Sequence, residues 1–422
     1  MAVSELLASS ASRSATSAAP PPRARLDAID LLRGIVMVIM VVDHTRDFAF
    51  ASTLHFSPTD LTQTTPAIFF TRWITHFCAP IFVFLAGTGA HLQRLRGRTA
   101  PELSRFLLTR GIWLIVLEFT VVGFGIRFAW DTAYPGVAQV IWAIGCGMII
   151  LAALVYLPTW VVGTIGVATI VLHNTLDVFP TYGWRGPPSP YPTMWQGIWT
   201  VLHGGAFLPL PLGHPFPVIV VLYAVIPWAG VMAAGYAAGA VYALEPAARR
   251  RVLLWIGSAA TAAFVVVRAI NSYGDPSPWA PQHSAVFTVL SFLNTTKYPP
   301  SLDYLLMTLG PALLALAAFD QVRPIKLLTP LITFGRVPLF FYLLQWYVAH
   351  GITIVASLLA HKPVDYLVWR TLPPPTPGPD AGFSLSATYL LWLLAIVVLY
   401  PLCAWFAGVK RRHRDWSWLS YL

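Results

Sequence analysis

Charged residues are scarce in this sequence: Asp, Glu, Lys and Arg together make up 10% of its 422 residues. Water-soluble domains carry about 25% charged residues, which cover their surfaces. Hydrophobic residues make up 57% of the chain, and the mean hydropathy is +0.66. The shortage of charge therefore excludes a water-soluble globular protein and predicts that lipid surrounds most of the chain.

Cysteine is also rare, because the chain holds three, Cys78, Cys146 and Cys403. They lie far apart within apolar segments, which excludes a disulfide framework and a cysteine metal site. The short alternating strands of a β-barrel are missing as well. Long apolar runs are present instead, and in lipid these must form helices, whose backbone groups bond within their own segment. The predicted fold class is all-α: a polytopic transmembrane helical bundle with no soluble domain.

Ten apolar segments are long enough to be membrane spans. They cover residues 29–50, 67–92, 104–126, 137–157, 159–177, 216–243, 252–271, 301–320, 328–358 and 384–408. Residues 1–24 are rich in Ser, Ala and Pro and predict a disordered cytoplasmic tail without a signal peptide. The transmembrane domain is predicted over 25–410, followed by a cytoplasmic tail, 411–422.

Basic residues follow alternate spans in short loops. The clusters are Arg94, Arg96 and Arg98; 249–251; Arg323 and Lys326; and 410–412 with Arg414. Cytoplasmic loops of membrane proteins carry such an excess, so we predict a multi-pass protein of the inner (plasma) membrane with both termini cytoplasmic. The longer loops 177–215, 272–300 and 361–383 are then outside. This topology accounts for the net charge of +10, and the lack of a basic stripe interleaved with aromatics argues against nucleic acid.

The first span contains ionisable residues that lipid disfavours. A charged side chain inside a bilayer costs at least about 2.5 kcal/mol. Helical spacing places the following residues on one face: Asp30, Arg33, Met37, Val41 and His44. Arg33 and His44 are then separated by ~16 Å along the helix. Asp43 and His44 form an adjacent carboxylate and imidazole near the outer surface, which is typical of proton transfer. The alternatives are an ion pair that fixes the helix end and a polar pair that cements packing.

Two further histidines belong to the same region. His55 lies in the first outer loop and His76 in the outer half of the second span, so the sequence predicts that both approach His44. Three histidines could bind zinc, but their spacing matches no zinc motif, and we predict no metal. The small residues within 84–90 would allow close approach of a neighbouring helix or a ligand.

Several motifs carry a family resemblance. The first is Arg25-x4-Asp30-x2-Arg33-Gly34 with Asp43-His44, followed by Ala-Pro-Ile-Phe-Val-Phe-Leu-Ala-Gly at 79–87. With segments 293–302, 306–311 and 334–344, the chain resembles the heparan-alpha-glucosaminide N-acetyltransferase catalytic-domain family, including bacterial members of unassigned substrate. The resemblance extends from about Arg25 to Trp405.

The resemblance implies a reaction and its histidine. The lysosomal member moves acetyl from cytosolic acetyl-CoA to an amino sugar across the membrane, using a luminal-loop histidine and an asparagine at the end of the first span. Here His55 stands at the position of that histidine and His44 at that of the asparagine. Arg33-x10-His44 also resembles the arginine–histidine motif of acyltransferases that O-acetylate bacterial surface glycans, in which the first-span histidine is the base. We therefore rank His44 before His55. Gln345 departs from the histidine of related sequences, and His350 could replace it.

The sequence thus predicts a membrane-bound, histidine-dependent acyltransferase. It would move an acyl group, most simply acetyl, from acetyl-CoA to a sugar or glycan hydroxyl or amine outside, with Asp43 or Asp47 orienting the imidazole. The catalytic candidates are His44, Asp43, His55, His76 and Asp47. The candidates for binding acetyl-CoA are Arg33, Asp30, Arg94, Arg98 and Arg336. The candidates for the acceptor are Lys297, Tyr298, Asp303, Gln345 and His350.

Two other classes remain open at this stage. Intramembrane charges and interrupted helices also fit a multi-span transporter or exporter of a small molecule or glycolipid. A non-catalytic scaffold or sensor is the third reading. The expected partners are the bilayer, acyl-CoA and a glycan acceptor, and an oligomer of identical chains is compatible with the sequence.

Overall fold

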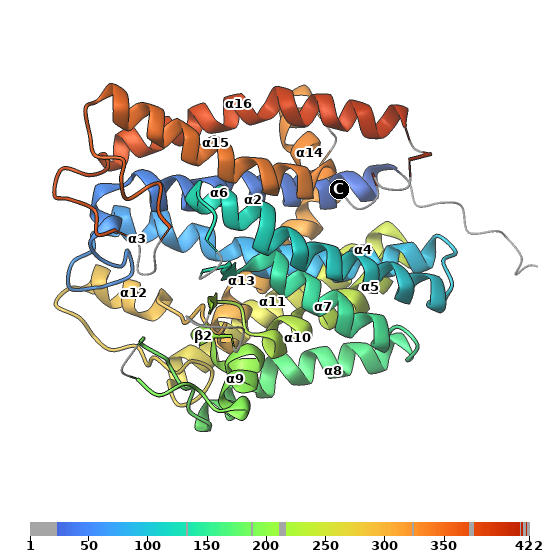
Figure 1. The fold of residues 1–422 in the computed structure, drawn as a ribbon. Coiled ribbons are helices and arrows are strands. Elements are labelled where there is room, and N and C mark those ends of the chain that lie inside the picture. Colours follow the sequence, from blue (N-terminus) through green and yellow to red (C-terminus); the bar gives the residue numbers. More distant parts are fainter. Residues whose placement is uncertain are drawn as a thin grey trace, which may run out of the picture.

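The computed structural model describes residues 23–131, 134–186, 189–210, 217–322, 325–370, 375–413, 415–416 and 419, with side chains from residue 27 onward. The predicted N-terminal tail lies outside the described residues up to residue 22, as do Arg323, Arg414 and most of the segment after residue 413. Helices dominate the fold and run nearly parallel or antiparallel through a bundle (Figure 1). The all-α prediction is confirmed.

Within the described residues, eight helical segments are long and apolar enough to cross a membrane. They are Pro66–Leu95, Ala100–Arg127, Thr159–Val178, Val225–Ala243, Pro246–Ile270, Leu302–Phe319, Pro338–Leu359 and Leu385–Arg412. Two more helices cross the bundle beside them: α2 (Arg23–Ala49), which carries several charges, and the shorter α7 (Val140–Leu154). These segments correspond in order to the predicted spans.

The spanning segments are built from the following elements. They are α3 (Pro66–Trp73), a 3-10 turn (Ile74–Phe77), α4 (Cys78–Leu95), α5 (Ala100–Leu117), a π-helical turn (Glu118–Val122), α6 (Gly123–Arg127), α8 (Thr159–Leu172), a 3-10 turn (His173–Val178), α10 (Val225–Ala238), a 3-10 turn (Gly239–Ala243), α11 (Pro246–Ile270), α13 (Leu302–Phe319), α15 (Pro338–Leu359) and α16 (Leu385–Arg412). A shorter helix, α14 (Thr329–Arg336), precedes α15. Two short helices, α9 (Met194–Trp199) and α12 (Ala285–Leu293), lie between spans, and neither is long enough to cross a bilayer.

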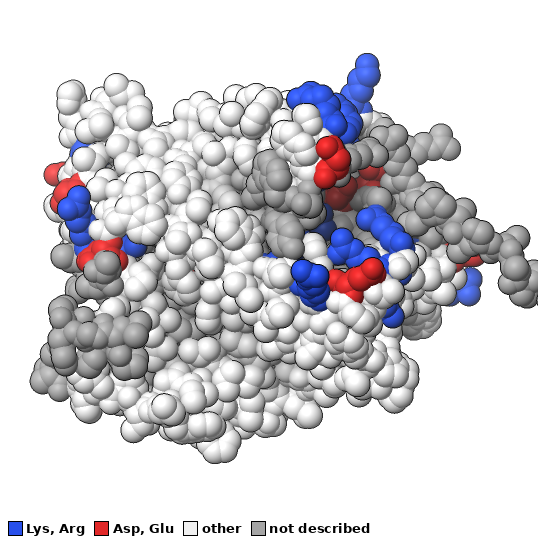
Figure 2. Space-filling model, turned by 45° about the vertical axis from the view of Figure 1, so that its right-hand side comes forward, with Lys and Arg blue, Asp and Glu red and all other residues white. Residues whose placement is uncertain are grey.

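The two ends of the bundle differ in character. The end of the bundle where α4 and α16 finish, at the right of Figure 1, is called the basic end below. Arg94 and Lys410 lie in the last turns of these two helices. The opposite end carries long connections, whose described residues are 179–186, 189–210, 271–301, 360–370 and 375–384, and it is called the loop end. In Figure 2, Lys, Arg, Asp and Glu gather toward the ends, while the flank between them is almost free of charge. A belt without charge between two polar ends is the surface that a bilayer requires.

Burial separates inner helices from outer ones. In the spans that contain α4 and α13, 67% of the most apolar window is buried, against 22% for α8, α11 and α16. The outer helices expose large apolar side chains such as Trp160, Trp255 and Val397. In water such a surface would drive association. In a membrane it faces lipid, so the structure supports a multi-pass membrane protein.

Glycines permit a close crossing of α4 and α10. A Cβ on Gly87 of α4 would lie 2.1 Å from the carbonyl oxygen of Met232, and one on Gly235 of α10 would lie 2.1 Å from that of Phe84. Any side chain would force these two helices apart. Within 84–90, Gly87 thus serves helix packing, whereas Gly89 has no atom within 4 Å of its Cβ position and faces a cavity.

Two predicted spans need correction. The segment 328–358 is two helices, α14 and α15, because Pro338 cannot donate a backbone hydrogen bond and forces Val337 out of helical geometry (φ −126°, ψ 50°). The segment 216–243 begins as a strand, and its helix starts at Val225. That strand, β3 (Val218–Val221), pairs in parallel with β1 (Gly136–Ala138) and antiparallel with β2 (Phe207–Pro209). The small sheet satisfies backbone groups of two connections, the one between α6 and α7 and the one that leads into α10.

Candidate functional site

A large polar cavity opens near the loop end. It has a volume of about 680 Å³ and is called the loop-end cavity below. Its wall comes from α2, the connection 57–59, α3, the 3-10 turn after α3, the connection 294–298 and α15. The ionisable and aromatic side chains that line it are Asp43, His44, Arg46, Asp47, Phe48, Arg72, His76, Tyr223, Lys297, Tyr298 and Trp346. The C-terminal half of α2 therefore directs its polar residues into one space.

The His44 imidazole is held in a fixed orientation. Its Nδ1 lies 2.8 Å from Oε1 of the fully buried Gln345, and its ring stacks on Trp346 with a centroid distance of 3.7 Å. The Gln345 amide nitrogen donates to the Tyr342 carbonyl oxygen at 3.3 Å, which turns Oε1 toward the histidine. Nδ1 then carries the hydrogen. No hydrogen bond in the described structure uses Nε2, so its lone pair is available to a molecule in the loop-end cavity.

The neighbouring carboxylates are engaged by arginines. Asp43 lies 2.5 Å from Arg72 and 2.8 Å from Arg46, and it accepts a hydrogen bond from Thr75 at 2.9 Å. Asp47 pairs with Arg46 at 2.6 Å. The prediction that Asp43 or Asp47 orients the imidazole is wrong. Consecutive residues point about 100° apart on a helix, so Asp43 faces α3 while His44 faces α15.

The other histidines separate into three environments. His76 lines the loop-end cavity, and its buried Nδ1 has no partner among the described residues. His55 is exposed at the end of a 3-10 turn and does not line the cavity. His350 is fully buried, stacked between Phe48 and Phe128, and its Nδ1 donates to the Gly125 carbonyl oxygen at 2.9 Å. The predicted convergence thus holds for His44 and His76, and the expectations that His55 joins them and that His350 meets an acceptor are wrong.

Two of the remaining acceptor candidates face the cavity. Lys297 and Tyr298 line it, with the Lys297 Nζ 5.3 Å from the Tyr298 ring. Burial raises the pKa of Tyr298, but nearby Lys297 and Arg72 lower it by more, so it lies below the ordinary value of 10.0. Asp303, which was predicted to contact the acceptor, does not line the cavity. It is buried, and its carboxylate lies 3.6 Å from Arg268.

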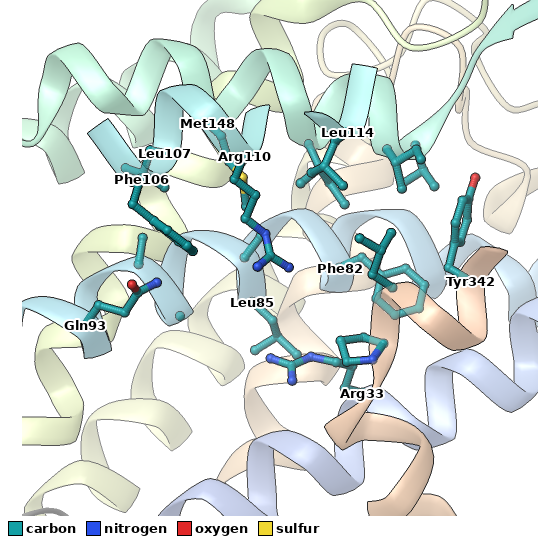
Figure 3. Close-up of a pocket in the computed structure, with 18 of the residues that line it drawn as sticks. Arg33, Phe82, Leu85, Gln93, Phe106, Leu107, Arg110, Leu114, Met148 and Tyr342 are labelled. Atoms are coloured by element: carbon teal, nitrogen blue, oxygen red, sulfur yellow. The ribbon is translucent and has the colours of Figure 1, made fainter. Parts of the chain in front are cut away.

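A second, mostly apolar cavity lies toward the basic end. It has a volume of about 230 Å³ and is called the basic-end cavity below. Figure 3 shows Gln93 and Tyr342 at its opposite ends, with the guanidinium groups of Arg33 and Arg110 reaching into the space between them. Arg33 is held by Asp30 at 3.3 Å and by the Gly335 carbonyl oxygen at 3.0 Å. An apolar slot that contains two guanidinium groups suits a molecule with an apolar arm and anionic groups.

The other predicted donor-binding residues lie at separate hollows of the basic end. Arg94 and Arg98 line one between the α4–α5 and α7–α8 connections. Arg336 lines another with Asp27 and Asp30, from which it lies 2.9 and 3.7 Å. The structure therefore places cationic groups around the basic end and brings only Arg33 of this predicted set into the basic-end cavity.

One turn of α15 stands between the two cavities. Tyr342 lines the basic-end cavity, Trp346 lines the loop-end cavity, and Gln345 lies between them. The Tyr342 hydroxyl is buried and has no hydrogen-bond partner in the described part of the chain. On the α2 side, Arg33 and Met37 line one cavity and His44 the other. The predicted polar face of α2 thus borders both spaces.

Sequence reasoning missed several residues at these cavities, among them Arg46, Arg72, Arg110, Tyr342 and Trp346. Arg72 and Arg110 are charges inside apolar spans, the same signal that identified the first span. Tyr342 and Trp346 resemble ordinary core aromatics, and no local pattern distinguishes them.

The described residues contain no group of three or more His, Cys, Asp and Glu side chains placed to hold a metal ion. Residues 25–273 match the family described as heparan-alpha-glucosaminide N-acetyltransferase, catalytic, which is more than half of the chain. A search of curated proteins finds no match. The matched region includes α2 and both of its cavity-lining ends, while Lys297 and Gln345 lie beyond it.

Proposed function

This chain belongs to the heparan-alpha-glucosaminide N-acetyltransferase catalytic family, and on that premise we propose that it transfers acetyl from acetyl-CoA to a sugar or glycan hydroxyl or amine on the other side of a membrane. The observation that carries the proposal is the placement of His44. Its imidazole is fixed by Gln345, its Nε2 is available in the loop-end cavity, and the same helix borders the basic-end cavity.

The proposed orientation places the basic end in the cytoplasm. The Lys and Arg residues of the short connections lie there, in agreement with the positive-inside rule. Both termini are then cytoplasmic, and the protein resides in the inner membrane. The loop-end cavity opens to the outside, where a glycan acceptor would be found.

Acetyl-CoA would bind from the cytoplasm as a substrate. Its pantetheine arm is long and narrow and would occupy the basic-end cavity, whose lining is mostly apolar apart from Arg33, Gln93 and Arg110. Arginine suits phosphate recognition because its planar guanidinium offers paired donors. Arg33 and Arg110 sit in the slot itself, and the hollows at Arg98 and Arg336 offer further cationic contacts near its mouth.

The chemistry assigned to His44 is general base catalysis. Nε2 accepts the proton of the acceptor hydroxyl or amine as its oxygen or nitrogen attacks the thioester carbonyl carbon. The carbon–sulfur bond then breaks, and the imidazolium returns that proton to the departing thiolate of CoA. Gln345 keeps the Nδ1–H tautomer during this cycle. The unpartnered Tyr342 hydroxyl is suited to donate to the carbonyl oxygen as its negative charge develops.

Two single substitutions test the proposal. Membranes that contain wild-type protein, His44→Ala or His55→Ala are incubated with labelled acetyl-CoA and a panel of sugars. His44→Ala should reduce acetyl transfer by about 10²- to 10⁴-fold, whereas His55→Ala should stay within about 2-fold of wild type, as expected of an exposed residue away from the cavity.

Thermal stabilisation by CoA provides the control, because His44→Ala should remain folded and bind the donor. Full activity of both variants would show the mechanism to be wrong. Sugar uptake by proteoliposomes without any acyl donor, together with no acetyl transfer, would instead support a transporter.

A further inference from the structure

The charges of the loop-end cavity do not balance. Three cationic side chains line it, Arg46, Arg72 and Lys297, against two carboxylates, Asp43 and Asp47. Both carboxylates are already engaged, Asp43 by the two arginines and Asp47 by Arg46. The excess positive charge therefore belongs to Lys297.

Lys297 is buried without an anionic partner. Only 8% of its surface is exposed, and no carboxylate lies within 4.0 Å of its Nζ in the described parts of the chain. The Nζ instead makes a cation–π contact with the Tyr298 ring, whose centroid lies 5.3 Å away. An ammonium removed from water is costly unless it is paired, so such a residue indicates a missing partner. The lowered pKa of Tyr298 agrees with a positive potential at this wall.

We propose that the acceptor carries an anionic group, either a carboxylate or a phosphate, that binds Lys297; this inference rests on the proposed acetyl transfer. The surrounding wall is rich in hydroxyl and amide side chains, which suit the hydroxyl groups of a sugar. They are Ser57, Thr59, Ser277, Asn294, Thr295 and Thr296. Because His44 lines the same cavity, an acceptor anchored at Lys297 presents its other groups to Nε2. The acceptor class is thus an acidic sugar or an acidic glycan terminus.

The test compares acceptors that differ by one anionic group. Acetyl transfer from labelled acetyl-CoA is measured with glucose, glucuronate and glucose 6-phosphate, and with glucosamine and glucosamine 6-phosphate. Wild type should prefer the charged member of a pair by about 10- to 100-fold in kcat/KM, the range of a hydrogen bond to a charged group. Glucuronate and the phosphates distinguish a carboxylate site from a phosphate site.

Variants assign the preference to one residue. In Lys297→Met the ratio of kcat/KM for the acceptor with the anionic group to kcat/KM for the acceptor without it should fall close to one. Lys297→Arg keeps the positive charge and should retain most of the wild-type preference. Lys362→Met is the matched control, because this lysine also lies at the loop end but its Nζ donates to the Asp380 carbonyl oxygen and does not line the cavity. It should retain the wild-type ratio.

Equal use of charged and neutral acceptors by wild type overturns the inference without any variant. An equal loss on both members of a pair in Lys297→Met also overturns it, because a merely structural role predicts that result. No transfer to any sugar in the panel would instead contradict the proposed function, so the two failures are distinguishable.

Discussion

Replacing Gln345 by leucine tests whether the orientation of His44 is part of the chemistry. The leucine has a similar size but removes the oxygen that accepts the Nδ1–H bond at 2.8 Å. Gln345 is fully buried on an inner helix, so no water replaces this acceptor. An unsatisfied buried donor costs about 1–3 kcal/mol. Since each 1.36 kcal/mol changes a rate about tenfold, the expected loss in kcat is about 10- to 100-fold.

The loss should be confined to the chemical step. Stacking on Trp346 still holds the imidazole plane, but the ring can adopt the other tautomer, in which Nε2 carries the hydrogen and cannot act as a base. The KM for acetyl-CoA should stay near the wild-type value, because Gln345 does not line the basic-end cavity. Initial rates with labelled acetyl-CoA in membranes, at several concentrations of donor and acceptor, separate the two constants.

Two further variants sharpen this test. Gln345→Glu keeps an acceptor for Nδ1–H and should be more active than Gln345→Leu. Gln282→Leu is the matched control, because Gln282 lies in a loop-end connection, where its side-chain amide donates to the Ala280 carbonyl oxygen at 3.1 Å and does not line either cavity. Full activity of Gln345→Leu would refute the role of the bond, and an equal loss in the control would show that the effect is not specific.

Three other substitutions address the cavities. The Cβ position of Gly89 faces open space in the basic-end cavity. Gly89→Leu should therefore fill part of that cavity and raise the KM for acetyl-CoA, whereas Gly89→Ala should leave the KM near the wild-type value. Equal KM values for the two variants would place the donor elsewhere. Tyr342→Phe should lower kcat by about 10²-fold, the effect of losing one donor to a developing oxyanion, and unchanged rates would exclude that role. Asp43→Asn leaves Arg72 without its carboxylate, while Arg46 keeps Asp47, and should destabilise the fold by about 3–5 kcal/mol. Thermal unfolding measures this loss, and an unchanged midpoint would contradict the assigned ion cluster.

The spans were predictable because each is a long apolar run. In lipid the backbone groups of such a run must bond within the segment, which requires a helix. The break between α14 and α15 was also signalled, by Pro338, but the surrounding apolar residues obscured it. The three-stranded sheet was not predictable in the same way. Its strands have three or four residues, too few to show an alternating pattern within an apolar sequence.

The site was predictable only where one helix carries it. Ionisable residues in the first span identified Arg33 and His44, because charge in an apolar helix requires an explanation. The partner that holds His44 is 301 residues away in sequence. Gln345 is neutral and stands alone among apolar residues, so nothing local connects it to an imidazole. The adjacent Asp43 looked like the natural orienting group, and only helix geometry shows that it points toward Arg72 instead.

The position of His44 also bears on how acetyl could cross a membrane without a leak. In the described residues no side chain lines both cavities, and the turn of α15 from Tyr342 to Trp346 closes the space between them. All three of its inward residues, Tyr342, Gln345 and Trp346, are almost fully buried. The residues that orient the base are therefore the residues that seal the passage. On the proposed function only the small thioester end of the donor has to reach this turn, so transfer requires a local displacement of α15 side chains rather than an open channel.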